Sequence, residues 1–310
     1  MPGDNLQTTL DLTIQAFAQQ DLQAAVKQWK AQGGRILVLN PKTGGILAMA
    51  QWPEPAPANW QNYPMQDWAD QPVQYAFEPG STIKPFTASA ALSTGTITTH
   101  TLLIDHGHVT FNGVTLYDWI PAGFGPLHLD GAMAVSSDVF FSTIAVRIGV
   151  QHYFQYLNLF HLNRPTGIDL PGESGGIVPP ENPDDSARPW RDGLRADHSH
   201  HSRAVGRRRG DRRRRRRVAC TARRENADTA GRAAQGAALP GKRLISTTVA
   251  QEVQQAMLAV VSRSVGTGTL ARVPGYVIAG KTGTANLPSP KGGFYRSRYL
   301  ASFIGFGPVP

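Results

Sequence analysis

A strongly basic segment in the second half of the chain decides which residues can form a core. Residues 181–240 contain 16 arginines and 8 acidic residues, and their densest part is the run Arg203–Arg224. Unpaired charge is heavily disfavoured in a protein interior. Of the 31 basic and 22 acidic residues in the chain, the other parts hold 15 and 14. The core must therefore be built from these nearly neutral parts on either side of the basic segment.

The remaining composition is that of a folded protein. Hydrophobic residues make up 41% of the 310 residues, enough to bury a sizeable core. The sequence contains neither 18 consecutive apolar residues nor a charged-then-apolar leader. We therefore expect the chain as written neither to span a membrane nor to carry a signal peptide. Cys220 is the only cysteine and no Cys/His cluster has zinc-ligand spacing, so we expect no internal disulfide and no metal.

The hydrophobic periodicity predicts an α+β fold. Apolar residues recur at helical spacing in three stretches, 15–32, 129–148 and 247–261, and Pro85 and Gly95 mark the start and stop of a further helix over about 81–93. Short apolar runs typical of strands cover 36–39, 46–50, 276–285 and 299–306. Turn residues between the first two runs indicate a hairpin, and the Pro- and Trp-rich stretch 52–74 is expected to be an ordered loop. Strands near both ends with helices between them favour a sandwich of helices and one antiparallel sheet.

The first candidate site is Ser81-Thr82-Ile83-Lys84, at the start of a predicted helix. Ser81 and Lys84 lie three residues apart and therefore share one helix face. A serine hydroxyl becomes a good nucleophile when a neighbour takes its proton, and a lysine amine can do this when burial and nearby cations lower its pKa. The helix N-terminus also favours developing negative charge. By itself, however, a Ser-x-x-Lys pattern occurs by chance on many helix surfaces.

The second candidate is Ser136-Ser137-Asp138, at an expected break between helical turns. A serine next to a carboxylate can relay a proton and hold a substrate amide. A polar kink or helix cap explains the same residues more simply, so this motif alone decides nothing.

The third candidate is Gly280-Lys281-Thr282-Gly283-Thr284-Ala285, at the end of a predicted strand. Glycines in a strand permit close backbone approach by a ligand. The lysine and the two threonines offer a cation and hydroxyls suited to a carboxylate. An ordinary transition from strand to turn is the alternative.

The three motifs in this order are stronger evidence for a catalytic site than any one of them alone. Ser-x-x-Lys, Ser-x-Asp and Lys-Thr-Gly follow each other as in the signature of penicillin-binding proteins and serine β-lactamases, with Asp138 in place of the more usual Asn. Six longer segments resemble the transpeptidase domain of class B penicillin-binding proteins, and the resemblance covers about residues 5–180 and 240–310. These segments are LNPKTGGILAMA, YAFEPGSTIKPF, AVSSDVFF, TGIDLPGES, VIAGKTGTA and ASFIGFGP. The resemblance implies the penicillin-binding, serine β-lactamase-like sandwich, a five-stranded antiparallel sheet flanked by helices, here one domain over 1–310 and incomplete at both ends.

The resemblance also implies catalytic roles. Ser81 resembles the nucleophile that is acylated, and Lys84 the base that activates it. Ser136 resembles the shuttle that carries a proton to the leaving group. The backbone N–H groups of Ser81 and Thr284 would form the oxyanion hole.

Substrate-binding roles are implied in the same way. Asp138 corresponds to the residue that hydrogen-bonds the substrate backbone. Lys281, Thr282, Gly283 and Thr284 resemble the strand that grips the terminal carboxylate of the substrate or of a β-lactam.

The implied function is that of a peptidoglycan D,D-transpeptidase, a β-lactam target that acts on D-alanyl-D-alanine stem peptides and needs no metal or organic cofactor. Expected partners are stem peptides, penicillin and other β-lactams, a glycosyltransferase and other cell-wall synthesis proteins, and no specific nucleic acid. The full-length parent is expected at the extracytoplasmic face of the bacterial membrane, on an N-terminal anchor that is absent here. AVSSDVFF is closer to elongation enzymes and ASFIGFGP to division enzymes, so the choice between these roles stays open.

Two other functions are compatible with parts of the sequence. The same site could serve a serine β-lactamase or a β-lactam sensor, although no segment resembles the Glu-bearing loop that a β-lactamase needs for deacylation. A nucleic-acid-binding function would depend on Arg203–Arg224 alone, and no aromatic residues interleave with these arginines to stack bases.

Residues 182–239 depart from the family pattern, which has there a Gly-Gln-Gly word and an Ala-rich helix. Arginine codons of the type CGC read one base later become GCC, which encodes alanine, so a compensated frameshift explains the arginine run better than a functional insertion. The rival explanation is a genuine basic loop that contacts anionic polymers. The DNA sequence across codons 180–242 distinguishes the two.

If these arginines replace a core helix, we expect 182–239 to lie outside the fold as a disordered loop, and the chain as written loses part of the packing behind its site. A domain is stable by only about 5–15 kcal/mol. We therefore predict that this chain aggregates readily and labels poorly with a fluorescent penicillin, whereas a frame-corrected, full-length version labels well. Equal labelling of the two versions on a gel would show that residues 182–239 are a tolerated insertion.

Overall fold

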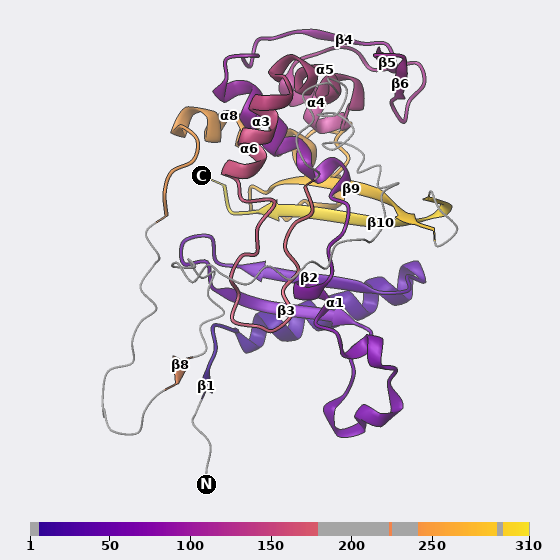
Figure 1. Ribbon diagram of the computed structural model, residues 1–310, viewed down its shortest axis with the longest axis vertical. Coiled ribbons are helices and arrows are strands. Elements are labelled where there is room, and N and C mark those ends of the chain that lie inside the picture. The colour runs from indigo at the N-terminus through magenta and orange to yellow at the C-terminus, as the bar shows by residue number, and fades with distance from the viewer. Residues whose placement is uncertain (1–5, 179–222, 225–240, 290–293, 310) are drawn as a thin grey trace. The chain divides into compact units, whose positions relative to one another are not determined.

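The computed structural model of the chain (Figure 1) describes residues 6–178, 223–224, 241–289 and 294–309. The chain divides into two compact units, which we describe separately. The first unit comprises Met1–Ala76, Arg164–Gly176 and Arg208–Lys242, and the second comprises Phe77–Asn163, Ile177–Arg207 and Arg243–Pro310. The segment 182–239, apart from residues 223–224, lies outside the described residues, so its predicted departure from the fold stays a prediction.

In the first unit, one helix packs on a two-stranded hairpin (Figure 1). Asp11 caps the start of helix α1 (Leu12–Trp29). Its carboxylate accepts hydrogen bonds from the backbone amides of Thr13 and Ile14, at 2.9 and 3.0 Å. Strands β2 (Gly34–Leu39) and β3 (Ile46–Trp52) pair antiparallel. One face of α1 and one face of β3 bury the apolar core of this unit, which consists of Ala18, Leu22, Val26, Ala48 and Ala50.

The rest of the first unit is made of short elements. The stretch predicted as an ordered loop contains three of them, η1 (Pro57–Asn62), η2 (Met65–Trp68) and α2 (Gln71–Gln74). They are too short for the helical periodicity of apolar residues that would have revealed them. Strand β1 (Leu6–Gln7) pairs antiparallel with β8 (Arg223–Arg224).

The second unit has a helical core. A 3-10 turn, η3 (Gly80–Ile83), runs directly into α3 (Lys84–Ser93). The other helices are α4 (Leu129–Val135), α5 (Asp138–Ile148), α6 (Val150–Leu159), α8 (Thr247–Ser262) and the 3-10 turn η4 (Thr269–Ala271). Side chains with no exposed surface form its centre: Ala88, Ala91, Met133, Phe141, Ile144 and Val260. None of the helices within the described ranges is long and apolar enough to cross a membrane.

The strands of the second unit form separate hairpins. Strands β9 (Ala279–Pro288) and β10 (Phe294–Phe306) pair antiparallel, with an irregularity between Phe294 and Tyr299, and α8 packs against β9. Two small antiparallel pairs lie between α3 and α4 in sequence. They are β4 (Leu103–Asp105) with β7 (Gly125–Leu127), and β5 (His108–Phe111) with β6 (Val114–Tyr117).

The sequence-based predictions identify the longer elements correctly and differ in detail. Predicted helix 15–32 begins and ends three residues earlier, at 12–29, and predicted strand 276–285 spans 279–288. The stretch 129–148 is two helices, separated at the expected break. Helices and antiparallel strands together give the predicted α+β class. Every sheet within the described residues has two strands, so the predicted five-stranded sheet is not confirmed.

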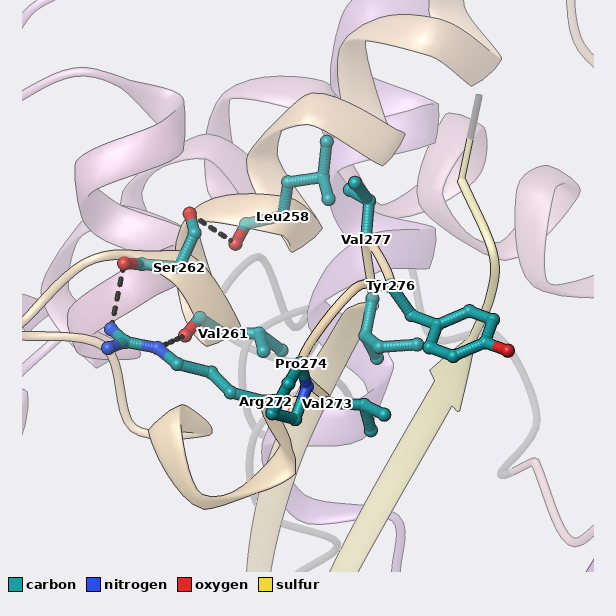
Figure 2. A pocket seen from close by; sticks show the side chains of 9 residues that line it. Leu258, Val261, Ser262, Arg272, Val273, Pro274, Tyr276 and Val277 are labelled. Atoms are coloured by element: carbon teal, nitrogen blue, oxygen red, sulfur yellow. Dashed lines mark hydrogen bonds between the residues drawn. The ribbon is translucent and has the colours of Figure 1, made fainter.

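A hollow of about 550 Å³ lies where α8 ends (Figure 2). The Arg272 guanidinium caps the helix there, because it donates hydrogen bonds to the carbonyls of Val261 and Ser262 at 2.7 Å and of Arg263 at 3.0 Å. A cation that satisfies the last carbonyls of a helix also complements its dipole. The residues lining this hollow are largely apolar and include none of the predicted site residues, so we assign it a structural role.

Candidate active site

The turn η3 brings Ser81 against strand β9. Gly80 has φ +52°, and a Cβ atom there would lie 2.5 Å from the Thr284 carbonyl oxygen. Only glycine permits both this backbone conformation and this close approach. Ser81 follows directly and is half-buried, whereas Lys84, one turn later, has no exposed surface. The nucleophile candidate thus lies next to the strand that carries the third motif.

The Lys84 ammonium holds the second motif in place. It donates hydrogen bonds to the Ser136 carbonyl at 2.7 Å and the Ser136 hydroxyl at 3.1 Å, and it pairs with the Asp138 carboxylate at 2.7 Å. An ammonium has three N–H donors, so these contacts use all of them. In the described structure, the hydrogen bonds of Lys84 therefore go to Ser136 and Asp138 and not to the Ser81 hydroxyl.

Ser136 adopts an unusual backbone conformation that joins α4 to α5. Its φ of 61° and ψ of 40° place it in the left-handed region, where it ends α4 as a C-cap. The next residue, Ser137, begins α5, since its hydroxyl accepts the Phe140 amide at 2.9 Å. A left-handed serine stores strain that the surroundings must offset. The break between the helices, predicted from the polar residues, is thus a strained turn.

Lys281 approaches Ser136 from strand β9. Lys281 has no exposed surface, and its Nζ donates to the Ser136 hydroxyl at 2.8 Å and to the Thr282 carbonyl at 3.0 Å. The Ser136 oxygen therefore accepts one hydrogen bond from each lysine. Since a hydroxyl oxygen has two lone pairs, it can accept both and so links the two lysine side chains.

Burial changes the charge of Lys281. Desolvation, and secondarily the nearby charge of Lys84, lowers the pKa of Lys281 to about 6, while Asp138 acts in the opposite direction. At neutral pH the Lys281 amine is therefore mostly uncharged in the empty site. An incoming anion would favour its protonated form.

The remaining residues of the third motif shape the strand beside Ser81. The Thr282 hydroxyl hydrogen-bonds the Thr267 hydroxyl at 2.7 Å, and Thr284 is exposed. At Gly283 a Cβ atom would lie 2.8 Å from the Thr82 side chain and 2.9 Å from the Pro79 carbonyl. Glycine at this position therefore lets β9 lie directly against the turn that carries Ser81.

All eight predicted site residues thus lie in the second unit, and direct contacts join Lys84, Ser136, Asp138 and Lys281. The structure adds residues that the sequence analysis did not identify, chiefly the buried carboxyl groups of Asp105 and Asp118 behind the Ser136 turn. Single aspartates at the ends of strands three or four residues long follow no motif, so nothing in the sequence marked them. Among the residues that the structure describes, no cluster of His, Cys, Asp or Glu side chains could hold a metal ion.

Comparisons with known proteins agree on one family. Residues 34–189 and 224–309 match the penicillin binding protein transpeptidase domain. The probable peptidoglycan D,D-transpeptidase PbpC of Pseudomonas aeruginosa is 30% identical over 97% of this chain and 51% of its own length. The penicillin-binding protein PbpB of Mycobacterium tuberculosis is 32% identical over 98% of this chain and 46% of its own length. The chain thus spans about half the length of these relatives.

A solved structure supports the same assignment. The transpeptidase domain of Burkholderia pseudomallei penicillin-binding protein 3 superposes on the whole chain with a TM-score of 0.74 and 26% sequence identity, and the match covers 86% of that domain. The fold is accordingly of the penicillin-binding type. With the three motifs in one buried cluster and the family match over most of its length, the chain belongs to the transpeptidase domain family of the class B penicillin-binding proteins.

Proposed function

We propose that the chain is the catalytic domain of a peptidoglycan D,D-transpeptidase that acts through a serine acyl-enzyme. The observation that carries this proposal is the Ser136 hydroxyl held between the buried amines of Lys84 and Lys281, beside the turn of Ser81. The name of the Pseudomonas relative, a probable peptidoglycan D,D-transpeptidase, points to the same reaction. The substrates are D-alanyl-D-alanine stem peptides, and penicillin and other β-lactams react at the same serine.

In the first half-reaction, the Ser81 oxygen attacks the carbonyl carbon of the penultimate D-alanine, and its proton passes to the Lys84 amine. The developing oxyanion accepts hydrogen bonds from the backbone N–H groups of Ser81 and Thr284. The close approach of Gly80 to the Thr284 carbonyl supports this pairing, since it places the two backbones side by side. When the C–N bond breaks, the terminal D-alanine leaves with a proton supplied through Ser136.

In the second half-reaction, an amine from a neighbouring stem peptide attacks the acyl-enzyme and restores the Ser81 hydroxyl.

Lys84 must lose a proton before it can act as a base. In the empty site its hydrogen bonds go to Ser136 and Asp138. The Ser136 hydroxyl offers the route by which Lys84 passes its extra proton to the uncharged Lys281 amine, because this hydroxyl contacts both lysine nitrogens. Asp138 positions the substrate backbone, and Lys281 with Thr282, Gly283 and Thr284 binds the terminal carboxylate.

The wider setting belongs to the same proposal. The five-stranded antiparallel sheet flanked by helices that is typical of the family is part of the proposal, and in the second unit we assign the antiparallel hairpin β9–β10 to it. The parent protein acts at the extracytoplasmic face of the bacterial membrane with a glycosyltransferase and other cell-wall synthesis proteins. A solved structure from Burkholderia ambifaria, titled a peptidoglycan glycosyltransferase, resembles this chain with a TM-score of 0.72 and 25% identity, and its title likewise concerns peptidoglycan synthesis.

We predict that penicillin acylates Ser81 and no other residue, because Ser81 lies in the turn that leads into the helix of Lys84 and that packs against Thr284 of β9. Peptide mass spectrometry after long incubation locates the adduct. Ser81→Ala and Lys84→Ala should abolish labelling, whereas Ser93→Ala, an exposed serine at the end of the same helix, should label as the parent chain does. An adduct at another residue would refute the assignment. A bound lifetime of seconds rather than hours would instead indicate a β-lactamase.

We also predict that binding of an anionic ligand takes up a proton. The pKa of Lys281 is about 6 in the empty site, and a bound carboxylate raises it, so affinity should fall as pH rises above about 6. Calorimetry of a Ser81→Ala variant with a β-lactam, in buffers of different ionisation enthalpy at pH 7.5 (about 1.5 units above that pKa), should show uptake approaching one proton. Lys281→Met should remove the uptake. Binding with no proton uptake and no pH dependence would contradict the assigned role.

A further inference from the structure

Behind the Ser136 turn lies a buried pair of carboxyl groups that belongs to none of the three motifs. Asp105 ends strand β4, and Asp118 directly follows strand β6. Their exposed fractions are 2% and 5%, and Ser137, which lies between them, has none. Buried carboxyl groups without a nearby cation are costly, so such a pair requires a compensating role.

Asp118 binds the start of α5. Its Oδ1 accepts the Asp138 amide at 2.6 Å, and its Oδ2 accepts the Val139 amide at 3.3 Å. The Ser137 hydroxyl accepts a hydrogen bond from the Phe140 amide. The first three N–H groups of α5 therefore all have acceptors. A carboxylate at this end also complements the helix dipole. Asp138 is thus held at two points, through its backbone by Asp118 and through its carboxylate by Lys84.

Asp105 and Asp118 form one hydrogen-bonded unit. The Ser137 hydroxyl lies 2.6 Å from Asp105 Oδ2 and 3.2 Å from Asp118 Oδ2. The Ser137 hydroxyl thereby connects the two carboxyl groups. Burial, and then the hydrogen bond with Asp105, raises the pKa of Asp118 to about 7, against the opposing effect of the Asp138 amide. Asp105 also accepts the Gly107 amide at 2.7 Å, which ties the pair to its own loop.

We propose that Asp118, supported by Asp105, is the positioning residue that fixes the Ser136–Asp138 turn against Lys84 and thereby sets the rate of acylation at Ser81. This inference rests on the proposed function for its kinetic consequence, but its geometry stands alone. The left-handed Ser136 needs external support, and the neighbouring Trp119 provides more by donating to the Val135 carbonyl at 3.0 Å. Without Asp118, two amides of α5 lose their acceptors and the turn can relax.

The test compares acylation kinetics of Asp118→Ala, Asp118→Asn and a control variant of the full chain. Asp130→Asn is the control, since Asp130 lies on α4 and forms only an exposed ion pair with Arg263 and a local backbone contact. Rates measured over a range of fluorescent penicillin concentrations separate the first-order acylation constant from the dissociation constant. Displacement of catalytic groups by about 1 Å costs on the order of 100-fold in rate.

We expect Asp118→Ala to lower the first-order constant by about 10- to 100-fold, with the dissociation constant nearly unchanged. Asp118→Asn retains one acceptor oxygen and should recover part of that rate, and Asp130→Asn should match the parent chain. Hydrogen exchange at the Asp138 and Val139 amides should accelerate in the alanine variant.

Several results would overturn the inference. An alanine variant that melts earlier but is acylated at the parent rate would show a purely structural role, as would a loss confined to the dissociation constant. If the alanine variant does not fold, the asparagine variant decides, and an unchanged first-order constant there counts against the proposal. Failure of a folded, soluble parent chain to be acylated at Ser81 would refute the proposed function instead, and the amide exchange rates would still test the positioning role.

Discussion

Two buried lysines share one hydroxyl, and the rest of the site depends on how the protein tolerates their charges. Lys84 and Lys281 have no exposed surface, and each donates to the Ser136 oxygen. Two cations so close in a medium of low dielectric constant repel each other strongly. Asp138 offsets one charge by its ion pair with Lys84, and the lowered pKa of Lys281 removes the other at neutral pH. The empty site therefore stays near neutrality, and an incoming carboxylate supplies the counter-charge that Lys281 lacks.

This near-neutral arrangement of charges requires the backbone of the Ser81 turn and that of strand β9 to approach each other closely. Gly80 and Gly283 let the turn of Ser81 lie against β9 without an intervening side chain. On the other side, Ser136 reaches both amines only because its backbone is left-handed. Glycine adopts such a conformation without cost, but it has no hydroxyl, so a serine held there by its neighbours is what the chemistry needs. The strain at Ser136 and the support behind it are thus parts of one arrangement.

Much of this could be predicted from the sequence, and the parts that could not have a common cause. The motifs identified Ser81, Lys84, Ser136 and Lys281 as candidate site residues, because the chemistry depends on residue type and spacing. Helix α8 was predicted because its apolar residues recur over several turns, and α3 because Pro85 and Gly95 mark its two ends. Periodicity says nothing about strands of three or four residues, so the region of β4 to β7 had no prediction. Asp105 and Asp118 lie in that region, and only the tertiary fold brings their carboxyl groups to the start of α5.

The family match and the site contacts that we describe both come from the parts of the chain outside most of the arginine-rich segment. The family match leaves out residues 190–223, which include most of the run Arg203–Arg224. Every hydrogen bond that we describe within the site joins residues drawn from Lys84, 105–140 and the strand and loop of 267–282. Among the described residues, these parts of the chain hold the two amines in place. The stability of the second unit decides how much of the population keeps that arrangement, and a change of a few kcal/mol is enough to alter it.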